Sequence, residues 1–175
     1  MVYDEALGKS SSRDSFDTTR GSSSRITEIN LAELRVRPGA GLILSDGAGR
    51  VLLMRRSGEG TWGIPGGGVE PGEAWSAAAL RECREETGWL ARIDGLLGVY
   101  SDPGTQVHRY PNGALEQLLG VVFRATAIKR VGVPDNETAE LRWVLPDRLP
   151  VPLFAPDIPV LRDAFSETTA WPIIG

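Results

Sequence analysis

The chain has 175 residues, of which 41% are hydrophobic and 24% are charged, as in an ordinary globular protein. Its formal net charge of −4 at pH 7 argues against a general binder of nucleic acid or of anionic membranes. With one cysteine, Cys83, and one histidine, His108, it can form neither a disulfide framework nor a zinc site of four Cys or His ligands. Its apolar runs are far shorter than the ~20 residues that a membrane crossing needs, so we expect a cytoplasmic protein that makes no membrane contact.

The start of the chain differs in composition from the rest. Between Gly8 and Arg25, nine of 18 residues are Ser or Thr, and Phe16 is the one large apolar residue. Such a segment cannot bury enough surface to offset the entropy lost on ordering it, which predicts a flexible Ser-rich tail at residues 1–25. The alternative is a tail that folds over a substrate or a partner subunit. Residues 26–175 are expected to form one domain.

The first half of this domain predicts strands followed by a helix. Residues 34–37 alternate apolar and basic side chains, which indicates a strand, and the apolar runs 42–44 and 51–54 flank a Gly-rich hairpin connection. A loop with Trp62 and the glycines Gly66 to Gly68 follows. Residues 74–87 are rich in Ala, Leu, Arg and Glu and precede Gly88, so they predict the clearest helix of the chain.

The second half repeats the order of strands and then a helix. Residues 93–100, 118–128 and 141–144 predict strands, separated by turn sequences at 101–104 and 110–113. Apolar residues at helical spacing behind Asp157 and Pro159 predict a short helix near the end of the chain. This order favours an α+β fold or a three-layer α/β/α sandwich over a doubly wound parallel sheet.

One face of the predicted helix at 74–87 is acidic. Glu82, Glu85 and Glu86 are spaced i, i+3 and i+4, so their side chains fall in one sector of the helix surface. Like charges at this spacing repel, which favours either full solvation or a counter-cation. Mg²⁺ prefers oxygen ligands and often links carboxylates to substrate phosphates. The alternative is a solvated acidic face balanced by Arg81 and Arg84.

The other side of this helix is expected to pack on the core. Ala77, Leu80 and Cys83 fall mostly outside the acidic sector and would anchor the helix. Cys83 is interpreted as a small buried hydrophobe rather than a catalytic thiol, because the sequence offers no base in a pattern that pairs with it.

The acidic helix belongs to a longer motif. Gly67, Glu73 and the segment 81–89 match the pattern G-x5-E-x7-R-E-U-x-E-E-x-G-U, in which U is a bulky apolar residue. The match resembles a complete Nudix box, with Cys83 and Trp89 where the family usually has Ile, Leu or Val. Residues 62–67 resemble the family's lead-in, and the similarity extends from about residue 35 to 165. The resemblance implies an α/β fold, the Nudix-type α/β/α sandwich with a mixed central sheet.

The resemblance also implies an activity. Nudix hydrolases cleave a nucleoside diphosphate linked to another group, with Mg²⁺ or Mn²⁺ as cofactor. Because the turn Tyr110-Pro111-Asn112-Gly113 resembles that of such members, we expect a substrate of the ADP-ribose or nucleotide-sugar type, cleaved to a nucleoside monophosphate and a phosphorylated partner. The alternatives are a (d)NTP pyrophosphohydrolase for nucleotide-pool cleaning and a non-catalytic nucleotide-binding regulator. We expect a small-molecule nucleotide as the partner and allow a homodimer, for which residues 26–34 could supply an exchanged strand.

The family's catalytic and metal-binding residues carry over position by position. Glu85 and Glu86 are expected to bind the metal, Glu82 to act as ligand or base, and the carbonyl of Gly66 to be a further ligand. Glu137 resembles a later-loop glutamate that serves as ligand or base in some members; the alternative is a solvated loop acid. The expected catalytic set is Glu82, Glu85, Glu86, Arg81 and Glu137. Glu73 and Arg81 are expected to orient the site. Glu140 is interpreted as a strand-end charge and Glu116 as an outside candidate for the base.

Substrate contacts are predicted from residues near the box. Arg55 and Arg56 could bind phosphate in a two-pronged manner or be exposed strand-end charges, and Arg37 is a similar candidate. Trp62 could stack on a base, although it more often packs structurally in this family. His108 is interpreted as a polar strand residue. The expected substrate-binding residues are Arg37, Arg55, Arg56, Trp62, Tyr110 and Asn112.

Overall fold

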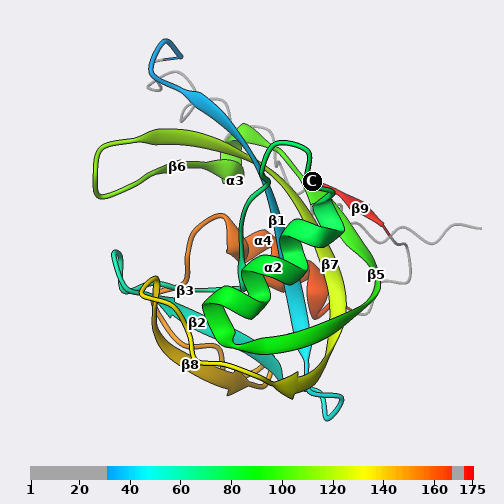
Figure 1. The fold of residues 1–175 in the computed structure, drawn as a ribbon. Helices are drawn as coiled ribbons and strands as arrows, with labels where there is room; N and C mark the ends of the chain where they lie inside the picture. The colour runs from blue at the N-terminus through cyan, green and yellow to red at the C-terminus, as the bar shows by residue number, and fades with distance from the viewer. Residues whose placement is uncertain (1–30, 167–171) are drawn as a thin grey trace, which may run out of the picture.

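The fold is built on one mixed sheet, seen in the computed structural model of residues 31–166 and 172–175 (Figure 1). Its main strand order is β3-β2-β1-β7-β5-β9, while β4 pairs with β1, β6 with β7, and β8 with β2. The predicted tail at 1–25 and most of the segment 26–34 lie outside the described residues. The strands are β1 (Arg35–Ser45), β2 (Val51–Arg56), β3 (Trp62–Gly63), β4 (Gly66–Gly68), β5 (Trp89–Tyr100), β6 (Val107–Arg109), β7 (Leu115–Arg130), β8 (Thr138–Val144) and β9 (Ile173–Ile174).

The centre of the sheet is the parallel pair β1 and β7. Their register runs from Arg35 opposite Glu116 to Ser45 opposite Thr126. β7 pairs antiparallel with β5, and β1 pairs antiparallel with β2 and β4. The sheet is therefore mixed, as predicted.

Helix α2 (Trp75–Thr87) covers one face of the sheet (Figure 1). It ends at Gly88, whose φ of 73° lies in the left-handed region and whose N–H donates to the carbonyl of Arg84. Ala78, Ala79 and Cys83 are fully buried against sheet residues such as Leu42 and Leu44. The expectation that Ala77 anchors this helix is wrong: Ala77 is exposed, because the helix is rotated so that Ala78 and Ala79 face the sheet.

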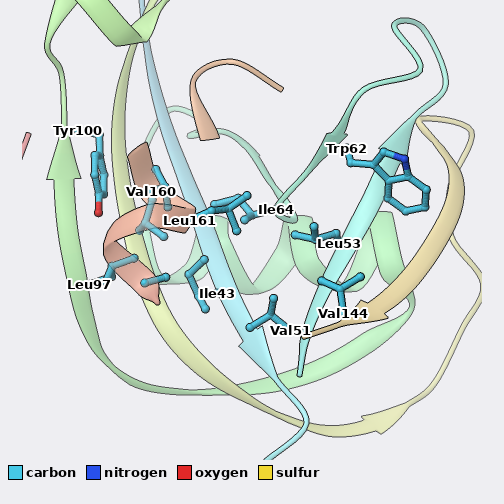
Figure 2. Close-up of a cluster of buried hydrophobic side chains, with 12 residues drawn as sticks. Ile43, Val51, Leu53, Trp62, Ile64, Leu97, Tyr100, Val144, Val160 and Leu161 are labelled. Atoms are coloured by element: carbon cyan, nitrogen blue, oxygen red, sulfur yellow. The ribbon is translucent and has the colours of Figure 1, made fainter. Parts of the chain in front are cut away.

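Helix α4 (Asp157–Ala164) covers the opposite face, where Val160 and Leu161 pack on Ile43 (Figure 2). Leu42 and Leu44 face α2, whereas Ile43 between them faces α4, as expected of alternating strand residues. The three layers confirm the predicted α/β/α sandwich. No helix in the described part of the chain has the length and apolar character needed to cross a bilayer.

The predicted strands are present but extend further than predicted. Residues 34–37 and 42–44, predicted as separate segments, belong to the single strand β1, and β5, β7 and β8 begin three or more residues earlier than predicted. The two- and three-residue strands β3, β4, β6 and β9 were not predicted, because such short segments carry no recognisable alternation. The short helix α3 (Pro103–Gln106) overlaps the turn predicted at 101–104, and the side chain of Asp102 caps it.

Candidate active site

Arg81 lies at the centre of the acidic face of α2. Its Nε and Nη2 donate to the two carboxylate oxygens of Glu73, each at 3.0 Å, and Nη2 also donates to the carbonyl of Gly68 at 2.9 Å. Its Nη1 donates to Glu82 at 2.8 Å and to Glu85 at 3.2 Å. The hydrogen bonds to Glu73 raise the pKa of Arg81 and lower the pKa of Glu73, so both stay charged. Arg81 thus fastens the loop before α2 to the helix.

The three box glutamates lie in one sector, as their spacing predicts, but in different environments. The side chain of Glu85 is 52% exposed and that of Glu82 is 17% exposed. Glu86 as a residue is only 2% exposed, and its Oε2 accepts the backbone N–H of Gly66 at 2.7 Å. Burial raises the pKa of Glu86 to about 8 and also raises the pKa of Glu82. A uniformly solvated acidic face is therefore ruled out by the burial of Glu86.

The glycine loop permits this close approach of helix and backbone. A Cβ on Gly67 would lie 2.5 Å from both Cδ and Oε1 of Glu82, so a side chain there would collide with the carboxylate. Gly66 pairs with Gly41 of β1 in the sheet. β4 therefore holds its backbone directly against the carboxylates of α2.

The loop between β7 and β8 adds two acids to this region. The backbone N–H of Asp135 donates to the carbonyl of Glu85 at 3.0 Å, and its carboxylate accepts the N–H of Glu137 at 2.9 Å. The charges of Asp135 and Glu137 contribute to the raised pKa values of Glu86 and Glu82, respectively. Asp135 was missed in the sequence, since no motif position marks it. Glu137 lies on the loop where the resemblance placed it.

Carboxylate oxygens dominate this region, and such hard donors suit Mg²⁺ or Mn²⁺. Within residues 31–166 and 172–175, no three His, Cys, Asp or Glu side chains form a ready metal-binding group. The guanidinium of Arg81 contacts Glu82 and Glu85. Burial is the main cause of the raised pKa of Glu86, and a bound cation would stabilise the charged form of this carboxylate. The oxygen donors thus have the chemistry that a divalent cation requires. In this arrangement, however, Glu82 and Glu85 are paired with the guanidinium of Arg81.

A pocket opens beside these acids. Gly66 and Gly67 line it, so the pocket is continuous with the backbone that contacts Glu82 and Glu86. Its other walls come from both halves of the chain and include Arg37, Arg56, Tyr110, Phe154 and Asp157. An apolar pocket with a few polar groups beside an acidic site is typical of small-molecule binding.

Asp157 is the acid of this pocket. Its Oδ2 accepts the backbone N–H of Ile64 at 2.9 Å, and burial raises its pKa to about 6 against a smaller opposing effect of Arg56. A neighbouring lining residue, Gln106, is buried and donates from Nε2 to the carbonyl of Pro156 at 3.0 Å. Neither polar side chain was predicted from the sequence. Asp157 stands at the start of a predicted helix, where an acidic residue is common, and its partner Ile64 is 93 residues away.

The structure brings some predicted substrate-binding residues together and not others. Arg37, Arg56 and Tyr110 line the pocket. Arg37 also pairs with Glu116 at 3.2 Å and lines a neighbouring groove with Arg81 and Glu82.

Arg55, Trp62 and Asn112 are not among the lining residues. Arg55 precedes Arg56 on β2 and so faces the other way, where it pairs with Glu140 at 3.4 Å. Trp62 is 4% exposed in the hydrophobic core, and the carboxamide of Asn112 accepts the N–H of Ala114 within its turn. Each of the three thus has its contacts outside the lining of this pocket, and its role toward a substrate stays a prediction.

Cys83 is fully buried, and burial raises its pKa to about 11. This agrees with its interpretation as a small hydrophobe, because only a thiolate is nucleophilic.

Comparison with known proteins is consistent with this geometry. The family model described as NUDIX domain matches residues 35–164. A solved structure, the "MutT NUDIX hydrolase from Burkholderia pseudomallei", superposes with a TM-score of 0.61 at 29% identity, covering 74% of this chain and 98% of that one.

Three relatives have names that specify different substrates. A "Putative 8-oxo-dGTP diphosphatase" of Bacillus subtilis is 34% identical over 113 residues, which are 65% of this chain and 69% of that protein. An "RNA pyrophosphohydrolase" of Teredinibacter turnerae is 34% identical over 122 residues, covering 62% and 70%. An "ADP-ribose pyrophosphatase" of Methanocaldococcus jannaschii is 39% identical over 77 residues, covering 42% and 41%.

Proposed function

The chain belongs to the NUDIX domain family and is a Nudix hydrolase, and we propose that it cleaves the pyrophosphate bond of a nucleoside diphosphate derivative. The products would be a nucleoside monophosphate and a phosphorylated partner. The observation that carries the proposal is the continuity of the acidic face of α2 with the pocket, through the backbone of Gly66 and Gly67. A ligand in the pocket would lie next to the carboxylates.

The proposed roles of the acids come from their positions in the Nudix box. Glu82, Glu85, Glu86 and the carbonyl of Gly66 would hold Mg²⁺ or Mn²⁺, with Glu137 as a further ligand. When bound, the cation supplies charge neutralisation for the phosphates and a lowered pKa for the attacking water. Arg81 would keep the box in place through its two-pronged bond to Glu73.

Water activation is assigned to two acids near the end of α2. Glu82 and Glu137 are the proposed acceptors for the proton of the water that attacks phosphorus. Glu82 is suited to this role because burial raises its pKa. Glu116 is less suited, because its carboxylate is engaged with Arg37.

The proposed ligand contacts are the lining residues Arg37, Arg56 and Tyr110. The two guanidinium groups offer positive charge for a diphosphate, and Tyr110 offers an aromatic surface. Arg56 is half-buried and acts electrostatically on Glu86 and Asp157, so it would lie between the carboxylates and the inner pocket.

We favour a substrate of the ADP-ribose or nucleotide-sugar type. Two observations support this: the turn at 110–113 places Tyr110 in the pocket wall, and one relative is named for ADP-ribose. The second candidate is a (d)NTP pyrophosphohydrolase, supported by the name of the Bacillus subtilis relative. A non-catalytic regulator is disfavoured, because every box glutamate is present.

We further propose one domain at 26–175 after a Ser-rich tail at 1–25, acting in the cytoplasm on small molecules rather than on nucleic acid. The net charge of −4 supports the last point, because it supplies no overall attraction to a polyanion. A homodimer is the proposed assembly, and size-exclusion chromatography with light scattering would test it.

A substrate panel tests the proposed function. Purified protein with Mg²⁺ or Mn²⁺ would be incubated with ADP-ribose, UDP-sugars, GDP-mannose, dinucleoside polyphosphates and all dNTPs, and the products resolved. We expect a nucleoside monophosphate from one nucleoside diphosphate derivative. Preferential release of pyrophosphate from a dNTP would select the second candidate, and a panel left wholly intact would refute hydrolysis of this substrate class.

A further inference from the structure

His108 is held at the edge of the pocket by a polar contact with Glu59 that is largely buried. Its Nε2 lies 3.3 Å from Oε1 of Glu59, and the two side chains are only 18% and 12% exposed. The other carboxylate oxygen of Glu59 accepts the hydroxyl of Thr61 at 3.5 Å. Burying two polar groups costs free energy unless they form a hydrogen bond with each other. The contact with Glu59 therefore fixes the orientation of the imidazole.

The fixed imidazole packs against two aromatic walls of the pocket. Its ring centroid is 4.8 Å from that of Tyr110, with the planes at 85°, and 4.7 Å from that of Phe154, with the planes at 67°. Such edge-to-face contacts are favourable and depend on ring orientation. Tyr110 and Phe154 line the pocket, whereas His108 is not a lining residue. His108 therefore borders the pocket through these two rings.

One of these rings supports a pocket cation. The guanidinium carbon of Arg56 lies 4.7 Å from the centroid of the Phe154 ring, and Arg56 lines the same pocket. The loop with Glu59 follows Arg56 directly and is tight, since the N–H of Gly60 donates to the carbonyl of Arg56 at 2.8 Å. The loop after β2, strand β6 and the segment before α4 thus meet at His108.

We propose that His108 is a positioning residue of the ligand pocket: pinned by Glu59, it sets the orientation of Tyr110 and Phe154, and thereby the place of the Arg56 guanidinium that binds an anionic nucleotide. His108 moves no proton in this role and does not touch the ligand. The inference rests on the proposed function only in taking a nucleotide as the ligand.

Steady-state kinetics on the fastest panel substrate would separate positioning from general structural support. His108→Phe keeps an aromatic ring in the space but loses the bond to Glu59, so the fold should survive. We expect its KM to rise about tenfold or more with kcat within about threefold, because the α2 carboxylates do not contact His108. Glu59→Gln, which can still hydrogen-bond to the imidazole, should stay close to the wild type, whereas Glu59→Ala should match His108→Phe.

The chain offers a matched control on the same strand. Arg109 follows His108 on β6, is exposed, and donates to the carbonyl of Gly113 rather than to a pocket residue. Arg109→Ala should leave KM and kcat unchanged. A double variant Glu59→Ala with His108→Phe should raise KM no further than either single change, because both break the same contact.

A second measurement does not depend on hydrolysis. His108 is the single histidine of the sequence, so its imidazole protons give an unambiguous NMR signal in protein without a histidine tag. Titration with ADP and with inorganic pyrophosphate should shift this signal saturably. A saturable shift with no hydrolysis of the panel would support the positioning role and count against the proposed function. A signal that stays in place with both probes, or an unchanged KM in His108→Phe, would overturn the inference.

Discussion

The burial of Glu86 leads to a prediction about both stability and turnover. Glu86→Gln replaces the carboxylate by an uncharged group of the same shape, whose amide oxygen can still accept the N–H of Gly66. Turnover should fall by orders of magnitude, because a proposed metal ligand is lost. The free energy of unfolding without metal should rise, because the substitution removes a charge from a site that is 2% exposed.

The size and sign of the stability effect follow from the pKa. The pKa of Glu86 is about 8 in the folded protein against 4.5 for the free side chain. As the pH rises, Glu86 therefore loses its proton in the unfolded chain before it does so in the folded protein. The protonated carboxyl stabilises the folded state below pH 4.5, and this contribution to the free energy of unfolding is lost as the pH rises to 8. At 1.36 kcal/mol per pKa unit, the loss is about 4 kcal/mol at pH 8. Glu86→Gln should not show this loss.

Urea unfolding in a chelator, followed by tryptophan fluorescence between pH 5 and pH 8, measures the effect. The difference between Glu86→Gln and the wild type should grow with pH, whereas Mg²⁺ should stabilise the wild type alone. Glu85→Gln is the matched control, because the carboxylate of Glu85 is 52% exposed and keeps most of its hydration on folding. Identical pH profiles for Glu86→Gln and the wild type would refute the reasoning, and an unchanged turnover would remove the proposed ligand role.

Three further substitutions probe the site. Arg81→Lys cannot reproduce the two-pronged bond to Glu73, so kcat should fall about 10- to 100-fold in steady-state assays; an undiminished kcat would contradict the orienting role. Asp157 has a pKa of about 6 in the folded protein against 3.8 for the free side chain, so the unfolding free energy of the wild type should fall by about 3 kcal/mol as the pH rises from 3.8 to above 6. Asp157→Asn should not show this fall. Parallel pH profiles of the two proteins in urea unfolding would contradict the raised pKa. Gly67→Ala would place a methyl group 2.5 Å from Cδ of Glu82, so activity should fall more than about tenfold. The circular dichroism spectrum should stay native. Full activity would show that the glycine loop can shift to accommodate the methyl group.

The parts of the site that were predicted correctly depend on local spacing. The sector shared by Glu82, Glu85 and Glu86 follows from helix geometry alone, and the neighbouring Gly88 marks the helix end. Their unequal burial could not be predicted, because it depends on the loop at 66–68 and on Asp135, which approach from other elements.

The pocket was hardest to predict. Its acid, Asp157, contacts Ile64 across 93 residues of sequence, and Phe154 reaches His108 only through the fold. The adjacent arginines Arg55 and Arg56 looked equivalent in sequence, yet strand alternation gives one to the pocket and the other to Glu140. Which of the two faces the ligand depends on the register of β2, which an isolated strand pattern does not specify.

The segment between β3 and β4 connects the two helical layers at the site. The backbone N–H of Ile64 donates to Asp157 at the start of α4, and the N–H of Gly66, two residues later, donates to Glu86 on α2. The helices cover opposite faces of the sheet (Figure 1). Both acids have pKa values raised by burial, and in each case a backbone donor from this segment and the charge of Arg56 oppose that rise by stabilising the charged form. A change in the length of this segment would move one donor away from its acid even with every box residue intact. The spacing of Ile64 and Gly66 is therefore as much a requirement of the site as the spacing of the glutamates.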